Sequence, residues 1–301
     1  MRKTSWLLIS IGLLIPVASI VYFGMDLFYV QRAPAAPDWQ EAARVVHEGW
    51  KEGDLVVFSP QWAQGASPLL KGLKVDTAEN PDWYEASKAS RVWVIGSMDG
   101  FDPEPPDGWK TLSEIAGRKV SVDLWQPPSG RELAYSLLDN IGDAVVSRIH
   151  PKRREICSNL KDSRWYCGKV HSWLFVGHSR KDIAGRVRDV IWAHAIDRTV
   201  VEAVWPKVPG DGTLTVHWGL TQRAAEAAEG KPTSFKVFLN GKAVLEDTLE
   251  VDEHTWHTID IPIKGTEPSE VKFQISSPGA QSRQVCFTAD LWRSKAGTDF
   301  L

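Results

Sequence analysis

The sequence predicts a multidomain α+β protein with an N-terminal transmembrane helix, a small α/β domain and a C-terminal jelly-roll β-sandwich. Three observations predict it: one long apolar run at the start, short helices alternating with apolar strands up to about residue 142, and many short β-type runs beyond it. The expected divisions are residues 1–31 for a cytoplasmic stub and anchor, 32–37 for a linker, 38–142 for the α/β domain and 143–301 for the sandwich.

Composition permits two folded domains and argues against a nucleic-acid partner. With 301 residues the chain exceeds the usual size of one compact domain, and 43% hydrophobic residues can fill more than one core. The net charge is −3 and no stripe of Lys and Arg interleaved with aromatic residues is evident, so no nucleic-acid binding is expected. The 15 Trp residues suit buried sheets, membrane interfaces and sugar platforms alike, so their number does not discriminate between these.

The first apolar run has the length of a membrane span. From Trp6 to Met25 there are 20 residues without a charge, which as a helix would cover about 30 Å, the thickness of the hydrocarbon core of a bilayer. Arg2 and Lys3 precede the run, so the positive-inside rule places the N-terminus in the cytoplasm. We expect a single-pass membrane protein that has a lipid bilayer as partner and the bulk of its chain extracytoplasmic, in the periplasm if the source is bacterial.

A cleaved signal peptide is the alternative interpretation of this run. Ala33-Pro34-Ala35 resembles an A-x-A cleavage site. However, the run is longer than the roughly 7–15 residues of a signal core, and Asp26 and Arg32 lie between the run and that site. The sequence therefore favours an anchor.

Helices and apolar strands alternate over residues 38–142. A helix is expected to start at Pro37-Asp38, where Asp38 and Glu41 would form a capping box. Further elements are expected as strands at 55–58, 91–95 and 120–125 and as helices at 109–116 and 130–140.

Ten short runs rich in Val, Thr, Phe and Trp follow between residues 144 and 292, and they predict the two-sheet sandwich. Asn240-Gly241, between two alternating runs, predicts a tight β-hairpin. One helix is expected to interrupt the strands at 222–228.

Cys157 and Cys167 lie ten positions apart in a loop-like stretch, and in an exported protein a disulfide between them is expected. The alternative is two free buried thiols. Cys286 lies in an apolar run and is expected to pack as a small hydrophobic residue. Neither a CxxC pair nor a His pair at ligand spacing accompanies these residues, so no metal and no cofactor are expected.

No catalytic residue can be assigned from the sequence. Ser179 follows Gly177-His178 as in the start of a nucleophile elbow, but Lys181 stands where the elbow requires a glycine. Carboxylates for glycoside hydrolysis cannot be identified, because spacing along the chain does not report their separation in space.

Trp192 and His194 form the candidate ligand-binding pair. Two residues apart on a strand, they share a face. Such a pair can line a sugar site, where the ring stacks on the sugar and the imidazole binds a hydroxyl. The alternative is core packing with one satisfied histidine.

Two parts of the chain resemble known families. WQEAARVVHEGWKEGDLVVFSP at 39–60, RVWVI at 91–95 and GRKVSVDLWQP at 117–127 resemble the extracytoplasmic module of polytopic glycosyltransferases of the dolichyl-phosphate-mannose type. Those enzymes keep their catalytic acidic residue in a many-helix membrane portion, so the resemblance implies a related soluble module without transferase residues. FKVFLNGKAVLEDTLEV and VCFTADLWR, within 200–292, resemble a galactose-binding-type β-sandwich, a domain that often binds carbohydrate through loops at one end.

Together these features predict a non-catalytic, membrane-anchored extracytoplasmic protein that binds a glycan or an envelope protein in cell-envelope polysaccharide assembly or protein glycosylation. One alternative is a membrane-anchored carbohydrate-active enzyme, a glycosidase or a transferase accessory subunit, which requires paired carboxylates in a pocket. The other is a structural protein of envelope assembly, which requires an exposed apolar patch.

Overall fold

The computed structural model describes residues 19–25, 33–77, 81–97, 104–116, 119–128, 130–168 and 173–294. Most of the expected membrane helix, residues 6–18, lies outside this set, and residues 19–25 are helical. In the described ranges no helix combines the length and apolar character that crossing a bilayer requires. The anchor and the localisation therefore stay predictions.

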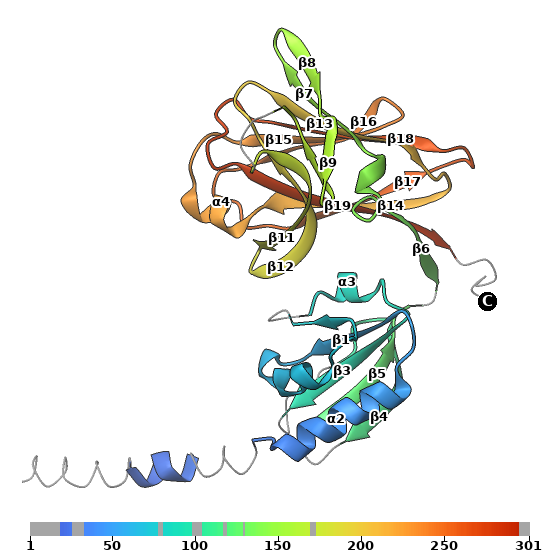
Figure 1. Cartoon of the computed structure of the whole chain (residues 1–301), viewed down its shortest axis with the longest axis vertical. Coiled ribbons are helices and arrows are strands. Elements are labelled where there is room, and N and C mark those ends of the chain that lie inside the picture. The colour runs from blue at the N-terminus through green and yellow to red at the C-terminus, as the bar shows by residue number, and fades with distance from the viewer. Residues whose placement is uncertain are drawn as a thin grey trace, which may run out of the picture. The chain divides into compact units, whose positions relative to one another are not determined.

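The chain divides into two compact units, Met1–Pro128 and Ser129–Leu301 (Figure 1). The sequence places this division after residue 142 because residues 130–140 read as a helix. In the structure β6 (Arg131–Ser136) is instead a strand that pairs antiparallel with β19 (Gln284–Ser294), and Leu137 lies in the sandwich core. The expected helix is wrong because this segment satisfies its backbone on a strand distant in sequence.

The first unit is an α/β layer (Figure 1). Its elements are α2 (Ala36–Gly49), β1 (Asp54–Phe58), the 3-10 helix η1 (Gln61–Leu69), β2 (Val75–Asp76), α3 (Trp83–Ala86), β3 (Arg91–Ser97), β4 (Lys110–Ala116) and β5 (Val120–Gln126). The five strands form one sheet of order β2-β1-β3-β5-β4, in which β1 is parallel to β2 and β3, and β5 is antiparallel to β3 and β4.

Side chains cover both faces of this sheet. α2 contributes Ala42, Ala43 and Val46 to a cluster that includes Trp93 of β3. The opposite face holds a second cluster around Trp125 of β5. Because both faces are covered, β1 and β3 carry the continuous apolar runs seen in the sequence.

Two local expectations in this unit are wrong. β4 replaces the helix expected over 109–116, because antiparallel pairing with β5 overrides the helical spacing. α2 begins at Ala36, so Asp38 lies in the first turn and accepts a hydrogen bond from the backbone N–H of Ala35 at 2.7 Å. Glu41 binds Arg44 at 2.5 Å and does not contribute to a capping box with Asp38.

The second unit is the expected β-sandwich (Figure 1). Its remaining elements are the 3-10 helix η2 (Ile141–Asp143), β7 (Val145–His150), β8 (Arg153–Ile156), β9 (Asn159–Lys161), β10 (Arg164–Tyr166), β11 (Phe175–Ile183), β12 (Arg186–His194), β13 (Val200–Val208), β14 (Gly212–Leu220), α4 (Gln222–Ala227), β15 (Thr233–Leu239), β16 (Lys242–Leu249), β17 (His257–Ile263) and β18 (Ser269–Ser276). An eight-stranded sheet has the order β17-β14-β19-β12-β11-β10-β9, with β6 added on β19, and a six-stranded sheet has the order β16-β15-β18-β13-β7-β8.

The sandwich core lies between these sheets. Trp205, Phe235, Phe273 and Phe287 are fully buried in it, and Phe273 stacks on Phe287 with ring centroids 4.5 Å apart. The predicted hairpin at Asn240-Gly241 is confirmed: both residues have positive φ, 50° and 78°, as a tight turn between twisted strands requires.

Candidate functional site

Strand register sorts the side chains of the eight-stranded sheet into two faces. Ala193 lies opposite Val176, and both belong to the sandwich core. Trp192 lies opposite Cys286 and belongs to a separate cluster on the outer face. His194, two residues further along β12, shares this outer face, as the sequence predicts.

Aromatic rings cover this outer face from β10 across to β12. We call the surface the aromatic face and define it by Tyr166, Trp173, Phe175, Trp192, His194 and Trp256. Phe175 stacks on Trp192 with centroids 5.9 Å apart, and the ring of His194 lies 4.8 Å from Trp173 and 6.1 Å from Trp192.

Trp173 is the ring that a ligand can reach. Its exposed fraction is 48%, whereas that of Trp192 is 5%. The ammonium of Lys181 lies 4.0 Å from the ring centroid of Trp192 and covers that ring. The sequence predicts Trp192 as the stacking surface, but Trp192 is nearly buried and the exposed ring beside it is that of Trp173.

Polar atoms beside Trp173 complete the group. The indole Nε1 of Trp192 is buried and finds no hydrogen-bond partner within the described residues. The Nδ1 of His194 lies 2.5 Å from the carbonyl oxygen of Ala195, which can only accept, so Nδ1 carries the proton. Burial lowers the pKa of His194, although its bond to Ala195 opposes this. The neutral ring of His194 therefore has its Nε2 as an acceptor, whereas the indole N–H of Trp192 lies buried.

Three cations lie over rings of the cluster, and sequence reasoning missed all three. Besides Lys181, Arg164 lies 4.7 Å from the centroid of Phe175 and Arg188 lies 5.4 Å from that of Trp256. Burial lowers the pKa of Arg188 to about 10, so it stays charged at neutral pH. A signal was present: in RVRDVIWAH both arginines share their strand parity with Trp and His.

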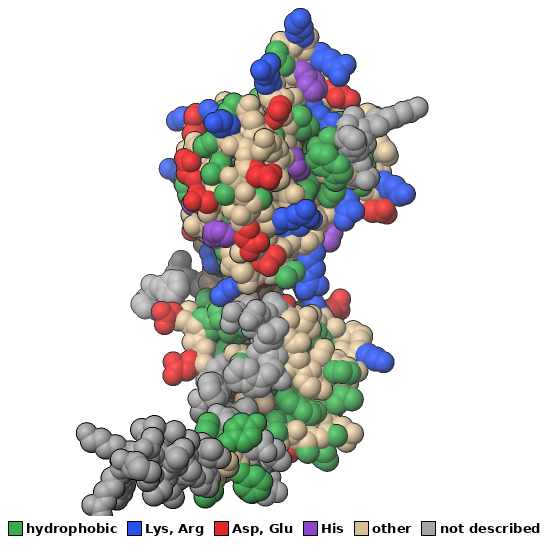
Figure 2. Space-filling model, turned by 90° about the vertical axis from the view of Figure 1, so that its left-hand side faces the viewer, with side chains coloured by type: hydrophobic (Ala, Val, Ile, Leu, Met, Phe, Trp, Pro, Cys, Tyr) green, Lys and Arg blue, Asp and Glu red, His purple; other side chains and the backbone are tan. Residues whose placement is uncertain are grey.

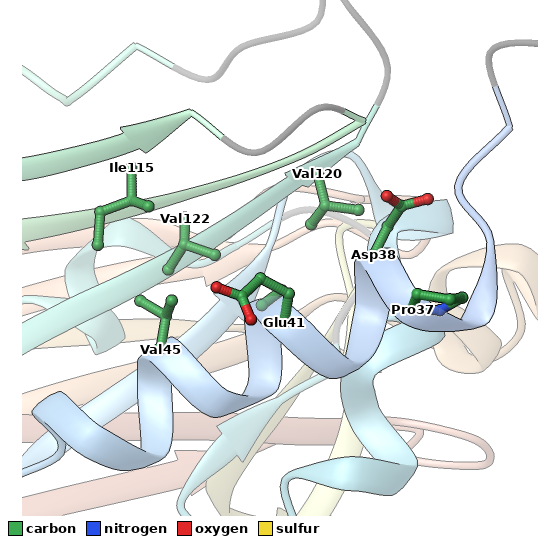
Figure 3. A pocket seen from close by; sticks show the side chains of 8 residues that line it. Pro37, Asp38, Glu41, Val45, Ile115, Val120 and Val122 are labelled. Carbon is green, nitrogen blue, oxygen red and sulfur yellow. The ribbon is translucent and has the colours of Figure 1, made fainter.

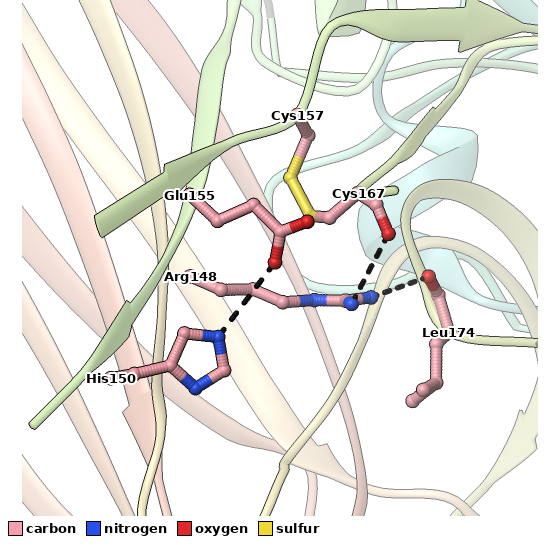
Figure 4. Close-up of a disulfide and its surroundings, with 6 residues drawn as sticks. All are labelled: Arg148, His150, Glu155, Cys157, Cys167 and Leu174. Carbon is pink, nitrogen blue, oxygen red and sulfur yellow. Dashed lines mark hydrogen bonds and ion pairs between the residues drawn. A yellow bond between two sulfur atoms is a disulfide. The ribbon is translucent and has the colours of Figure 1, made fainter. Parts of the chain in front are cut away.

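The disulfide between Cys157 and Cys167 is present, as predicted (Figure 4). It joins the residues that follow β8 and β10 and so closes the β9–β10 hairpin. Beneath it the guanidinium of Arg148 donates to the carbonyls of Cys167 at 3.3 Å and Leu174 at 2.8 Å. Burial lowers the pKa of Arg148, opposed by the charge of Glu155. These bonds link β7, which carries Arg148, to the residue after β10 and the residue before β11.

Other candidate groups lack the geometry of a catalytic site. Ser179 lies within β11, paired with Val190, so it does not occupy a strand-to-helix turn. Cys286 is fully buried as predicted, and burial raises the pKa of its thiol. Across the described part of the chain no three His, Cys, Asp or Glu side chains could hold a metal ion.

A pocket of ≈ 220 Å³ lies in the first unit between α2 and strands β4 and β5 (Figure 3). Val45 and Glu41 of α2 face Ile115, Val120 and Val122 across it. The second carboxylate on its rim, that of Asp38, binds the N–H of Ala35. Hydrogen bonding to Arg44 lowers the pKa of Glu41, the opposite of what a general acid needs.

Basic side chains gather at the end of the sandwich that bears the β7–β8 hairpin (Figure 2). Lys152, Arg153 and Arg154 lie there, and Arg154 forms an ion pair with Glu202 at 2.6 Å. The hairpin sequence contains no Phe, Tyr or Trp, which distinguishes this end from the aromatic face.

Fold and contacts together define a two-unit protein whose β-sandwich bears an aromatic, cation-covered outer face. No family model matches the chain, and no curated protein matches it. Solved structures that resemble it include CBM51 from Clostridium perfringens GH95 in complex with methyl-galactose, at 22% identity over 38% of this chain and 79% of that one, with a TM-score of 0.30. Another is CBM51-2 in complex with GlcNAc and INT domains from Clostridium perfringens ZmpB, at 14% identity over 81% of this chain and 48% of that one, with a TM-score of 0.35.

Tandem CBM51 modules of a family 98 glycoside hydrolase from Streptococcus pneumoniae match at 11% identity over 52% of this chain and 50% of theirs, with a TM-score of 0.34. Similarity this low does not transfer a ligand or a binding site to this chain. These three neighbours are carbohydrate-binding modules, and the expected relation to dolichyl-phosphate-mannose-type transferases finds no support among them.

Proposed function

We propose that this chain is a non-catalytic glycan-binding protein of the cell envelope, anchored in the membrane by residues 6–25, with its sandwich extracytoplasmic. The observation that supports glycan binding is the exposed ring of Trp173, 4.8 Å from His194. An exposed aromatic ring presents an apolar surface to the C–H face of a sugar, and the imidazole of His194 beside it would accept a hydrogen bond from a sugar hydroxyl.

The test is isothermal titration of the full chain, in a detergent without a sugar headgroup, against a panel of neutral and acidic envelope glycans. At least one glycan should bind at millimolar concentration or below. Trp173→Ala should weaken that binding about tenfold, because stacking and burial on one ring contribute on the order of 1.4 kcal/mol.

Leu112→Ala is the matched control, because Leu112 is 47% exposed, like Trp173, but lies on β4 of the first unit. It should bind as the parent chain does. A panel on which nothing binds at millimolar concentration, or a Trp173→Ala variant with undiminished affinity, would exclude the glycan site.

The anchor has a separate test. Membranes from cells that express the chain are washed with alkaline carbonate, which releases peripheral proteins. We expect the chain to stay in the membrane pellet and a variant that lacks residues 6–25 to be released. Release of the intact chain would contradict anchoring and would leave glycan binding to be decided by the titration.

A further inference from the structure

Four exposed cations lie at one end of the sandwich, outside the aromatic face. Lys152, Arg153 and Arg154 belong to the β7–β8 hairpin (Figure 2), and Arg198 lies in the loop before β13. We call these four side chains the cationic end. The chain as a whole has a net charge of −3, so positive charge is a property of this end and not of the whole surface.

Strand pairing brings Arg198 to the hairpin. Val200 of β13 lies opposite Ile149 of β7. The hydroxyl of Thr199 lies 3.1 Å from Nδ1 of His150, the last residue of β7. The chain before β13 therefore runs beside the end of β7, and Arg198 lies next to the turn that joins β7 to β8.

Most of the positive charge at this end is uncompensated. Arg154 has a carboxylate partner, Glu202, at 2.6 Å, and Glu202 also accepts a hydrogen bond from Gln274 at 2.8 Å. The other three cations make no ion pair within the described ranges of the chain: Lys152, Arg153 and Arg198.

Two further carboxylates near the hairpin are held by other groups. The Oε2 of Glu155 lies 3.7 Å from Nε2 of His150. Asp197 accepts a hydrogen bond from the backbone N–H of Ala280. In the part of the chain that the structure describes, neither carboxylate forms an ion pair with the cationic end.

The backbone of Arg198 is unusual for an arginine. Its φ is 53°, in the left-handed region, where a Cβ is crowded and Gly or Asn fits more readily. The side chain is exposed, so burial of its stem does not offset this cost. Residues that break a local backbone preference in this way cluster at functional positions. The charge of Arg198 is the property that Gly or Asn would not supply.

The opposite end of the same sheet provides the contrast. The nine residues of β13 separate the two ends by about 26 Å. Lys207 and Lys242 lie at that opposite end together with Glu267 and Glu270. Charges of both signs are mixed there, so an anion would meet attraction and repulsion at once.

We infer that the cationic end binds an anionic polysaccharide through its carboxylate or phosphate groups. The planar guanidinium groups of Arg153 and Arg198 match either oxyanion with paired hydrogen bonds. The hairpin has no ring on which a nucleic-acid base would stack, which favours a saccharide over a nucleic acid. This inference rests on the proposed glycan-binding function for the class of ligand, and it adds a second surface apart from Trp173.

The test compares charged polysaccharides with their neutral parent. Carboxymethyl dextran and dextran phosphate are titrated into the full chain beside dextran, in a detergent without a sugar headgroup. At least one charged polymer should bind about tenfold more tightly than dextran, and added salt should weaken that binding. The two charged polymers distinguish a carboxylate ligand from a phosphate ligand.

The double variant Arg153→Gln with Arg198→Gln removes two of the uncompensated cations. It should weaken binding of the charged polymer about tenfold and leave binding of dextran unchanged. Lys207→Gln with Lys242→Gln is the matched control, because it removes the same net charge from the opposite end, and it should bind as the parent chain does. Both double variants should melt at the temperature of the parent chain, because all four side chains are exposed.

Arg198→Asn separates a role in binding from a role in the fold. Asn adopts the left-handed backbone more readily than Arg. The variant should therefore melt at or above the temperature of the parent chain and still bind the charged polymer more weakly. A variant that melts lower and binds as the parent does would make Arg198 a structural residue and overturn the inference.

The outcomes separate this inference from the proposed function. Equal weakening by both double variants, or by neither, overturns the cationic end as a binding surface and leaves the site at Trp173 to its own titration. Binding of neutral glycans alone does the same. Binding of duplex DNA with no charged polysaccharide bound would assign this end to nucleic acid and also overturn the inference.

Discussion

Trp93 of the first unit and Trp192 of the second are alike in burial and differ in their partners. Each lies on an inner strand beneath a cation, Arg91 at 5.8 Å and Lys181 at 4.0 Å. Trp93 donates its indole N–H to Asp54 at 2.9 Å, and the same carboxylate binds Arg91. Trp192 lacks a hydrogen-bond partner in the described chain.

The difference is that the polar groups around Trp93 are paired with one another, whereas those around Trp192 are not. Around Trp93 every charge has a partner, so the group stabilises the fold. Burial alone would raise the pKa of Asp54, but hydrogen bonds from Arg91, Trp93 and the N–H of Lys51 lower it overall. Around Trp192, Lys181 has no carboxylate partner among the described residues, and the indole N–H stays unpaired in the interior.

The largest expected effect on stability is that of Asp54→Ala. It leaves Arg91 partly buried without its carboxylate, and breaking a buried ion pair in this way typically costs about 3–5 kcal/mol. Hydrogen exchange of β1 and β3 amides measures the loss within the first unit. Asp54→Asn, which can still accept from Trp93, should lose less. Amides of β1 and β3 that stay fully protected in Asp54→Ala would contradict a structural role for the group.

Low pH should remove part of the stability that Asp54→Ala removes. A carboxyl whose pKa is lowered in the folded state contributes stability above its ordinary pKa of about 3.9 and loses it as pH falls through the lowered value. Protection of β1 and β3 should therefore fall below about pH 4. The Asp54→Asn variant, which has no charge to lose here, should respond less, and equal acid responses would rule out Asp54 as the source.

A matched pair of smaller changes isolates the hydrogen bond. Trp93→Phe and Trp192→Phe each remove an indole from a buried strand, but only the first removes a bond to a carboxylate. Trp93→Phe should destabilise its unit by about 1.5–3 kcal/mol more than Trp192→Phe destabilises the sandwich. Denaturant unfolding followed by exchange at each strand gives both values, and equal losses would mean that the indole of Trp192 does have a partner.

The smallest expected effect is that of Lys181→Met on stability. Because Lys181 faces Arg188 and has no described ion pair, loss of its charge should change the free energy of unfolding of the sandwich by less than about 1 kcal/mol. Arg91→Met leaves the buried carboxylate of Asp54 without its ion-pair partner and should lower the free energy of unfolding several times more. Similar losses in thermal melts of the two variants would show that Lys181 is structural and would remove the contrast.

Features set by neighbouring residues could be predicted from the sequence. Asn240-Gly241 predicted its hairpin, the two disulfide cysteines lie only ten positions apart, and strand parity placed Trp192 on the same face as His194. Features set by distant pairing could not. β4 and β6 read as helices because the strands that hold them, β5 and β19, are recognised only after folding.

Of the candidate site, only the part that depends on neighbouring residues could be predicted from the sequence. The parity of RVRDVIWAH already placed two arginines with Trp192. Lys181 joins them only through the register that the Ala184-Gly185 turn imposes, with φ of 52° and 73°. The exposure of Trp173 has no signature in the sequence, because tryptophan is common both in cores and at binding surfaces.

The pairing of β6 with β19 decides how the sandwich can be produced alone. A recombinant fragment that begins at residue 143 would lack β6, and residues 290–294 of β19 would present an unpaired edge. Such edges template pairing between copies. A fragment that begins at residue 129 keeps the edge covered, so the choice of first residue would decide between a monomer and an edge-paired aggregate.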